Sequence, residues 1–229
     1  MHTGDANDGR FTVNSILHRT TAFSAAGLVV AGGALVGAVT DAQAAPEART
    51  GPVAVVQPEP PGEGKRVLDH HYQPQPNSYY CAPAATRIAL TTQGKVLSQQ
   101  EVAKKLQTTT AGTDSVEDTT RVLNELTGGG YETTEIDGAT ASPQEVDKLR
   151  RDVVEAIDGR RGVVANITGA AADTTGEKRA YVGGHYLSIV GYRDGGEFVR
   201  VADPYDPEAH YWMRDDDMAD WIAERGYSS

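Results

Sequence analysis

Cysteine is almost absent from this chain of 229 residues, and positive charge is scarce. The single cysteine, Cys81, has no partner within the chain, so an intrachain disulfide is excluded and the thiol is inert, reactive or paired elsewhere. Lysine and arginine number 21 against 32 acidic residues, which gives a net charge of −11. Because nucleic acids and anionic membrane surfaces bind clusters of basic side chains, we expect neither as a partner.

Long hydrophobic runs are also scarce, and residues 22–39 form the one long apolar stretch without charge. Arg19 precedes this run and Ala42-Gln43-Ala44 follows it, which is the order of a cleavable export signal. The run is rich in glycine and alanine, so we expect cleavage before Ala45 rather than a retained anchor. A twin-arginine signal is less favoured than the general secretory route, because the second arginine is missing. We therefore predict a signal peptide over residues 1–44, a secreted protein and no stable membrane association after cleavage.

The remainder of the chain divides into a linker and one domain. Residues 45–65 are rich in proline, glycine and glutamate, a composition typical of a flexible linker. Residues 66–229 have the length of one ordinary domain and contain no internal repeat.

Helix signals come first in this domain and strand signals follow. The sequence predicts helices over 81–92, 98–106, 115–127, 142–157 and 216–224. It predicts strands over 67–72, 162–168, 185–192 and 197–202. Helices followed by an antiparallel sheet indicate the α+β class.

Several helix starts carry capping signatures. Ser98, Ser115 and Ser142 are each followed three residues later by an acid, which is the pattern of a capping box. The acidic run Asp215-Asp216-Asp217 is expected to cap the last helix and to interact with its dipole.

The pair Asp194-Gly195 stands between the last two predicted strands and is a strong signal for a β-hairpin turn. If these two residues form the turn, His185 is expected opposite Pro204, and Asp203 opposite Tyr186. A shift of the turn by one residue would change this register little. His185 and Asp203 should therefore lie at the same open end of the hairpin, within roughly 5–8 Å of each other. An imidazole and a carboxylate so placed can serve as a base and its orienting acid.

Cys81 stands at the expected start of the first helix, because Pro83 fits only a first turn. The helix dipole and a neighbouring histidine lower the pKa of such a thiol from about 8.5 into the range of roughly 3.5–7.5. The thiolate can attack a carbonyl, His185 can protonate the leaving amine, and Asp203 can hold the ring. The Cys81 N–H and the side-chain amide of Gln75 are candidates to stabilise the oxyanion.

Ordinary structural roles compete with this hypothesis. A cysteine is often a buried apolar residue, and an Asp-Pro pair often marks only a turn. Asp206 competes with Asp203 for the orienting role and is the less favoured of the two. His70-His71 suggests metal, but no second ligand cluster has matching spacing, so we expect no metal and no cofactor. Asn166-Ile167-Thr168 matches a glycosylation acceptor, but it falls in a predicted strand and is interpreted as structural.

Three segments together resemble a known family, namely residues 75–85 (QPNSYYCAPAA), Gly183-Gly184-His185-Tyr186 and Asp203-Pro204. They are similar to the bacterial papain-like cysteine peptidases of family thirty-nine, relatives of the bacteriocin-processing peptidases that cut after a double-glycine leader. The resemblance covers roughly Arg66 to Gly226. It implies a papain-like α+β fold in which N-terminal helices pack on a C-terminal antiparallel sheet. It also implies the following roles: a nucleophile, Cys81; a general base and acid, His185; an orienting acid, Asp203; and an oxyanion donor, Gln75.

Two features depart from the family pattern. The family usually has glycine where this chain has Ala82; the added methyl group can narrow the cleft beside the nucleophile, but we expect alanine to be tolerated in a helix. The leader-processing members are fused to a transporter, whereas this sequence carries no transporter segment and an export signal instead. Processing of bacteriocin leaders is therefore not expected here.

Four hypotheses about function follow. The first is a secreted cysteine peptidase that acts on a protein or peptide substrate, in an oligomeric state that the sequence does not indicate. The second is a cell-wall amidase or peptidoglycan endopeptidase with the same triad, although no wall-binding repeat or basic patch supports it. The third is a papain-like binding module without catalysis, against which the complete set of site residues argues. A transglutaminase-like acyl transfer shares the Cys-His-Asp order, but Gln75, six residues before Cys81, fits a peptidase better.

Overall fold

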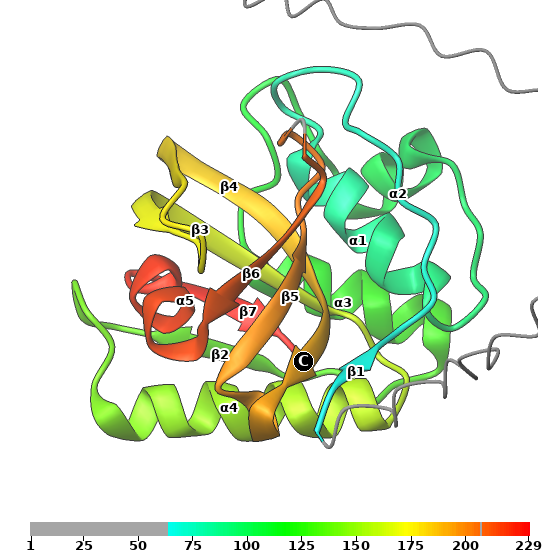
Figure 1. The fold of residues 1–229 in the computed structure, drawn as a ribbon. Helices are drawn as coiled ribbons and strands as arrows, with labels where there is room; N and C mark the ends of the chain where they lie inside the picture. Colours follow the sequence, from blue (N-terminus) through cyan, green and yellow to red (C-terminus); the bar gives the residue numbers. More distant parts are fainter. Residues whose placement is uncertain (1–63, 207) are drawn as a thin grey trace, which may run out of the picture. The chain divides into compact units, whose positions relative to one another are not determined.

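The computed structural model describes residues 64–206 and 208–229, which form an antiparallel sheet with helices on both faces (Figure 1). The helices of this part are α1 Cys81–Thr91, α2 Gln99–Leu106, α3 Val116–Thr127, α4 Pro143–Asp158 and α5 Asp215–Ile222. Its strands are β1 Arg66–Val67, β2 Thr133–Ile136, β3 Val163–Ala172, β4 Lys178–Arg193, β5 Phe198–Ala202, β6 His210–Arg214 and β7 Arg225–Ser228. The predicted signal peptide and nearly all of the predicted linker lie outside the described residues. Within those residues, no helix has the length and apolar character needed to span a membrane.

The strands follow the order β2-β7-β3-β4-β5-β6, and β1 adds to β4. β1 finds room there because β3 begins only at Val163, which pairs with Ile189 and leaves the end of β4 open on that side. The approach of β1 requires glycine at position 191, since a Cβ on Gly191 would lie 2.5 Å from the carbonyl oxygen of Arg66. The strand predicted for residues 67–72 is thus shorter than expected and begins one residue earlier.

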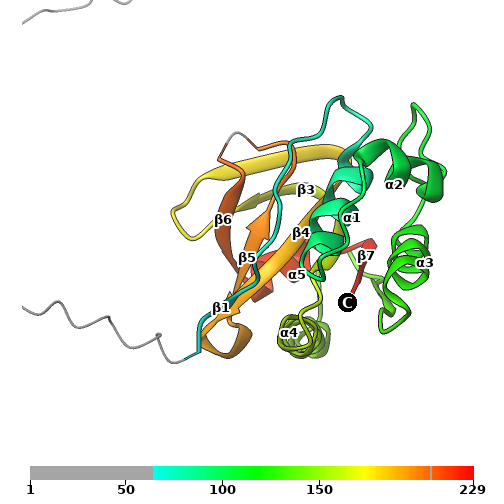
Figure 2. The ribbon, with the colours of Figure 1, turned by 90° about the vertical axis from the view of Figure 1, so that its right-hand side faces the viewer.

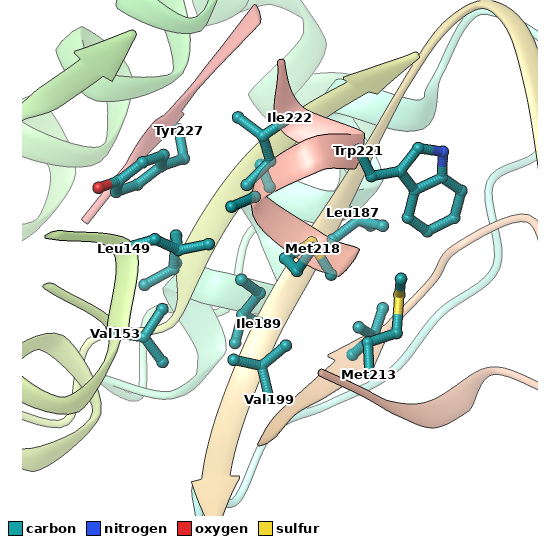
Figure 3. Packing of buried hydrophobic residues seen from close by; sticks show 14 of the residues in the cluster. Leu149, Val153, Leu187, Ile189, Val199, Met213, Met218, Trp221, Ile222 and Tyr227 are labelled. Atoms are coloured by element: carbon teal, nitrogen blue, oxygen red, sulfur yellow. The ribbon is translucent and has the colours of Figure 1, made fainter. Parts of the chain in front are cut away.

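Alternating side chains of the central strands separate two layers of core. Val163 and Ala165 of β3 pack with α4 and α5, whereas Val164 packs with α1, α2 and α3. Figure 2 shows α1, α2 and α3 together on one side of the sheet. Figure 3 shows the other layer, where side chains from α4, α5 and the strands meet: Leu149, Val153, Leu187, Ile189, Val199, Met218 and Ile222. The predicted α+β class is confirmed, with helices covering the second face of the sheet as well.

The capping signatures succeed at two helices and fail at two. Ser98 and Ser142 each form the full capping box, with Glu101 and Glu145 respectively. Ser115 precedes α3 as predicted, but its side chain makes no cap hydrogen bond and instead bonds to Glu117. The three aspartates of α5 occupy its first turn rather than the cap, which is Arg214. The prediction of a capping box at Ser115 and of an aspartate cap for α5 was therefore wrong.

The β4–β5 hairpin forms as predicted, but its register differs. The turn takes residues 194–197 rather than two residues, and an irregularity at Val190 shifts the register again. As a result Ser188 pairs with Ala202. The predicted pairings, His185 with Pro204 and Asp203 with Tyr186, are wrong by one residue, because turn length and bulge were not visible in the sequence.

Candidate active site

Cys81 is the first residue of α1 and follows the N-cap residue Tyr80. Pro83 lies in the first turn, where its missing N–H removes no intrahelical hydrogen bond. The thiol is partly buried, and the backbone N–H groups of Ala82 and Tyr186 donate to its sulfur. These donors and the dipole of α1 both stabilise negative charge on the sulfur.

A bulge in β4 positions His185. Between Tyr181 and His185, three residues of β4 lie opposite a single residue of β3. Gly183 and Gly184 within this bulge have φ angles of 118° and 97°, a region that residues with a side chain rarely adopt. The bulge leaves Val182 96% exposed, whereas His185 directly after it is only 4% exposed. The two glycines before His185 thus allow β4 to bend at the bulge, so that the strand is exposed at Val182 and directs the imidazole of His185 inward.

Asp203 directly follows β5 and is fully buried behind His185. Its Oδ1 accepts hydrogen bonds from His185 Nε2 at 2.8 Å and from the backbone N–H of Tyr205 at 3.0 Å. Its Oδ2 accepts from the hydroxyl groups of Tyr181 at 2.8 Å and Tyr211 at 2.9 Å. Because the carboxylate only accepts, Nε2 of His185 carries the proton, and Nδ1 is the ring nitrogen left for Cys81. The structure thus brings Cys81, His185 and Asp203 together in a row.

One aromatic ring stacks on the imidazole, and a second ring stacks on the first. Tyr181 stacks on His185 with ring centroids 4.1 Å apart and an interplanar angle of 24°. Trp221 of α5 stacks in turn on Tyr181, with centroids 5.8 Å apart. The face of an aromatic ring attracts a cation, so Tyr181 both fixes the plane of the imidazole and favours its charged form.

The electrostatics of the three residues favour an ion pair. Burial opposes ionisation of Cys81, but the hydrogen bond and charge of His185 outweigh it and hold the pKa of the thiol below its usual value. Burial likewise disfavours the imidazolium, yet hydrogen bonds to Asp203 and Cys81 raise the pKa of His185 to about 9. The pKa of Asp203 is lowered despite its burial, chiefly by His185. The lowered pKa of the thiol and the raised pKa of the imidazole both favour a thiolate–imidazolium pair over two neutral groups.

Gln75 lies in the segment that leads into α1. Its backbone N–H donates to the carbonyl of Pro204 at 2.9 Å, which ties this segment to the loop after Asp203. Its side-chain Nε2 donates to the carbonyl of Asn77 at 2.6 Å. One amide hydrogen is thus engaged, and the second is left for another acceptor. The role of Gln75 as an oxyanion donor stays a prediction.

The competing candidates have other partners in the structure. The Asp206 carboxylate pairs with Arg179, which also binds Asp173 and Glu208. Asp206 is thus committed to a guanidinium, and Asp203 is the carboxylate that holds His185. Asn166, the asparagine of the pattern that matches a glycosylation acceptor, lies in β3 and is 8% exposed. This agrees with its interpretation as a structural residue.

Of the two neighbouring histidines considered for metal binding, His70 has protein partners for both ring nitrogens. Nε2 of His70 lies 2.7 Å from Nε2 of His210, and Nδ1 of His70 donates to the carbonyl of Leu68 at 2.9 Å. Over residues 64–206 and 208–229, no three side chains of histidine, cysteine, aspartate or glutamate gather as a metal site.

The tyrosines around Asp203 are the residues that the sequence did not reveal. Tyr181 belongs to the part of β4 that was not predicted as a strand, and Tyr211 belongs to β6, which was not predicted at all. Their hydroxyl groups reach Asp203 only through the pairing of β4, β5 and β6. No local motif marks them, because each contact depends on strand register.

A cysteine at the start of a helix, packed on an antiparallel sheet that carries the histidine, is the arrangement of the papain-like α+β fold. The family model described as Peptidase_C39 like family matches residues 67–228, and the chain belongs to this family of peptidases. The predicted family and fold class are thereby confirmed. No curated protein matches the sequence.

Solved structures with a similar arrangement are distant in sequence. One is a C39-like peptidase from Bacillus anthracis with 11% identity and a TM-score of 0.49, covering 72% of this chain and 96% of that one. Another is the peptidase domain of Streptococcus ComA, a bifunctional ABC transporter in a quorum-sensing pathway, with 13% identity, a TM-score of 0.47 and coverage of 69% and 96%. A third is a double-glycine motif protease of an AMS/PCAT transporter in complex with its leader peptide, with 12% identity, a TM-score of 0.44 and coverage of 71% and 91%.

Proposed function

We propose that the protein is a secreted cysteine peptidase that hydrolyses peptide bonds with Cys81, His185 and Asp203. Membership of a peptidase family supports the reaction class. The observation that carries the assignment is the buried Asp203 carboxylate, held by three side chains and two backbone N–H groups, with one oxygen 2.8 Å from His185 Nε2. A carboxylate held in this way fixes the imidazole so that its other nitrogen serves the thiol.

In the first half of the reaction, the Cys81 thiolate attacks the carbonyl carbon of the scissile bond. The imidazolium of His185, whose pKa is raised to about 9, gives its proton to the leaving amine as the C–N bond breaks. The amine-containing fragment departs and a thioester remains on Cys81. Asp203 stabilises the imidazolium before this transfer and orients the ring throughout.

In the second half, a water molecule attacks the thioester while neutral His185 accepts its proton. The C–S bond breaks, the carboxylic acid product leaves, and the thiolate–imidazolium pair is restored. Both tetrahedral intermediates carry an oxyanion. The backbone N–H of Cys81 and the uncommitted hydrogen of the Gln75 amide are the donors that we assign to it.

The test is the pH dependence of Cys81 alkylation by iodoacetamide, combined with peptide hydrolysis. In the full chain, the thiol should titrate well below about 8.5 and return toward that value in His185→Ala. Cys81→Ala should lose at least about 10³-fold of the hydrolysis of a peptide pool. An unreactive thiol would leave a binding module as the better hypothesis. Hydrolysis of muropeptides without hydrolysis of peptides would favour the cell-wall amidase.

Export is part of the proposal and rests on residues 1–44 alone. The uncharged run 22–39 and the small residues before Ala45 support it. N-terminal sequencing of the protein from culture medium should yield a chain that begins at Ala45. Recovery of the intact chain from the membrane fraction would instead indicate a retained anchor.

A further inference from the structure

A hollow beside the thiol continues into a second hollow along the sheet. The first, of about 260 Å³, is lined by Cys81, Gly184 and Tyr186 among others. The second, of about 350 Å³, lies where α3 begins and where β2 and β7 meet. Asp114, Asn166 and Arg225 line both hollows. The two hollows therefore adjoin at these residues, and together they reach from Cys81 past the start of α3.

The second hollow is strongly acidic. Its carboxylates are those of Asp114, Glu117, Glu135, Asp137 and Glu224, and we name the hollow that they line the acidic groove. All five side chains are exposed, and none forms an ion pair with another residue of the described segments. Among the residues that the structure describes, Arg225 is the only cation that lines it, at the junction with the first hollow.

A hollow elsewhere on the domain shows that this imbalance is local. The hollow between α4 and the start of β2 has Glu132, Asp152 and Glu155 on its walls, but Lys148 and Arg161 line it as well. Its charges are therefore nearly balanced. The acidic groove instead concentrates negative potential in a concave surface that opens toward the thiol, where it attracts cations.

A buried polar side chain faces the junction between the two hollows. Asn166 is 8% exposed, and its Nδ2 donates to the hydroxyl of Tyr186 at 3.1 Å. Among the described residues its Oδ1 accepts no hydrogen bond, yet this atom lies beside the open space above Gly184. A Cβ at Gly184 would lie 3.8 Å from both Asn166 Oδ1 and Arg225 Nη2. The missing side chain of Gly184 thus leaves room for a ligand that donates to Asn166.

We infer that the acidic groove binds the part of the substrate that carries lysine or arginine, with Asn166 Oδ1 accepting an N–H of the bound peptide. The substrate class is then a protein or peptide with basic side chains close to the scissile bond. This inference rests on the proposed peptidase function, since it concerns the same thiol. Exposed ion pairs are individually weak, so the selectivity arises from several of them acting together.

The test compares the full chain with a groove variant on matched pools of short quenched fluorescent peptides that are cationic, neutral or anionic. The parent should hydrolyse the cationic pool with a kcat/KM about tenfold above that of the neutral pool, and added salt should reduce this preference. The double variant Glu117→Gln/Glu135→Gln should lose about threefold or more of the preference. The matched control Glu132→Gln/Glu155→Gln removes the same charge from the balanced hollow and should keep it. Mass spectrometry of the products then gives the position of the basic residues relative to the cut.

A binding measurement separates the two proposals. With the Cys81→Ala protein, the fluorescence anisotropy of the labelled cationic pool should rise more than that of the neutral pool. When Cys81→Ala also carries the two groove substitutions, the rise for the cationic pool should be smaller. Hydrolysis of all pools at equal rates would overturn the inference and leave the peptidase intact. Selective binding without hydrolysis by the parent would uphold the groove and overturn the peptidase. Equal binding of all pools would overturn the groove whatever the activity.

Discussion

Two histidines on strands of this sheet that are separated by β5 form side-chain pairs of similar geometry and have opposite preferences for charge. Nε2 of His185 on β4 lies 2.8 Å from Oδ1 of Asp203, and Nε2 of His210 on β6 lies 2.7 Å from Nε2 of His70. Yet the pKa of His185 is raised to about 9, whereas that of His210 is lowered to about 4. Burial lowers both values, and His185 is the more buried of the two.

The charge of the partner accounts for the difference. Asp203 and the Cys81 thiolate stabilise an imidazolium at His185. His210 is desolvated, and the positive charges of His70 and Arg200 disfavour its imidazolium further. In this sheet, then, a carboxylate partner raises the pKa of a buried imidazole so that it can donate a proton. An imidazole with a hydrogen bond of similar length but no carboxylate partner stays neutral.

The substitution with the largest expected effect on the difference between the two histidines is Asp203→Asn. It removes the negative charge and keeps the size of the side chain. The pKa of His185 should fall from about 9 toward 6.5, and the alkaline limb of kcat/KM against pH should fall with it. Peptide hydrolysis at neutral pH should decrease on the order of 10²–10⁴-fold, because the imidazolium is no longer stabilised or oriented. Steady-state kinetics across pH measures both effects.

Asp206→Asn is the matched control for this prediction. It removes a carboxylate three positions away that binds Arg179 rather than His185. In Asp206→Asn, the alkaline limb of kcat/KM against pH should therefore stay near pH 9, even though Arg179 loses one of its carboxylate partners. A lowered limb in Asp206→Asn with an unchanged limb in Asp203→Asn would assign the orienting role to Asp206.

A smaller effect is expected from the second pair, and it concerns stability at acid pH. Since the folded pKa of His210 is about 4 against about 6.5 when unfolded, the unfolded chain binds a proton more readily between these values. The contribution of His210 to the free energy of unfolding is thus present above about pH 6.5 and is lost as the pH falls through 4. His210→Gln keeps a donor for His70 but does not titrate, so it should flatten this part of the stability curve. Denaturant unfolding at several pH values measures the slope.

His71→Gln controls for the loss of a histidine as such. His71 is exposed and stands next to His70 in the sequence, so His71→Gln replaces a histidine outside the pair. If His210→Gln followed the parent curve as closely as His71→Gln does, the opposition between the two pairs would not extend to stability.

Much of the fold was predictable because its helices carry local signals. Ser98 and Ser142 form the boxes that their spacing indicated, and Pro83 fixes the start of α1. Strands β2, β6 and β7 could not be found in this way. β2 and β7 are four residues each, and they are strands because they pair with each other, which is a property of the folded chain.

The candidate site divides along the same line. His185 and Asp203 are joined by a hairpin, so their proximity was predictable even with a register wrong by one residue, whereas the place of Cys81 beside them followed from the family resemblance. The two tyrosine hydroxyl groups that donate hydrogen bonds to Asp203 were not predictable. Tyr211 bonds Asp203 from the next strand, and Tyr181 bonds it from across the β4 bulge, so both contacts depend on register and bulge geometry.

The smallest expected effect comes from Tyr181→Phe, and it sharpens the comparison because both histidines have a tyrosine neighbour. Tyr181 stacks on His185 at 4.1 Å, whereas Tyr72 lies tilted at 54° to His210 at 5.3 Å. Phenylalanine keeps the stack and removes one of two hydroxyl groups from Asp203 Oδ2, while Tyr211 remains. The free energy of unfolding should fall by about 0.5–1.5 kcal/mol, and kcat/KM by less than about tenfold. The alkaline limb should stay near pH 9, because the charge of Asp203 is intact. A limb that moved as far in Tyr181→Phe as in Asp203→Asn would show that the tyrosine hydroxyl, and not the carboxylate charge, separates the two histidines.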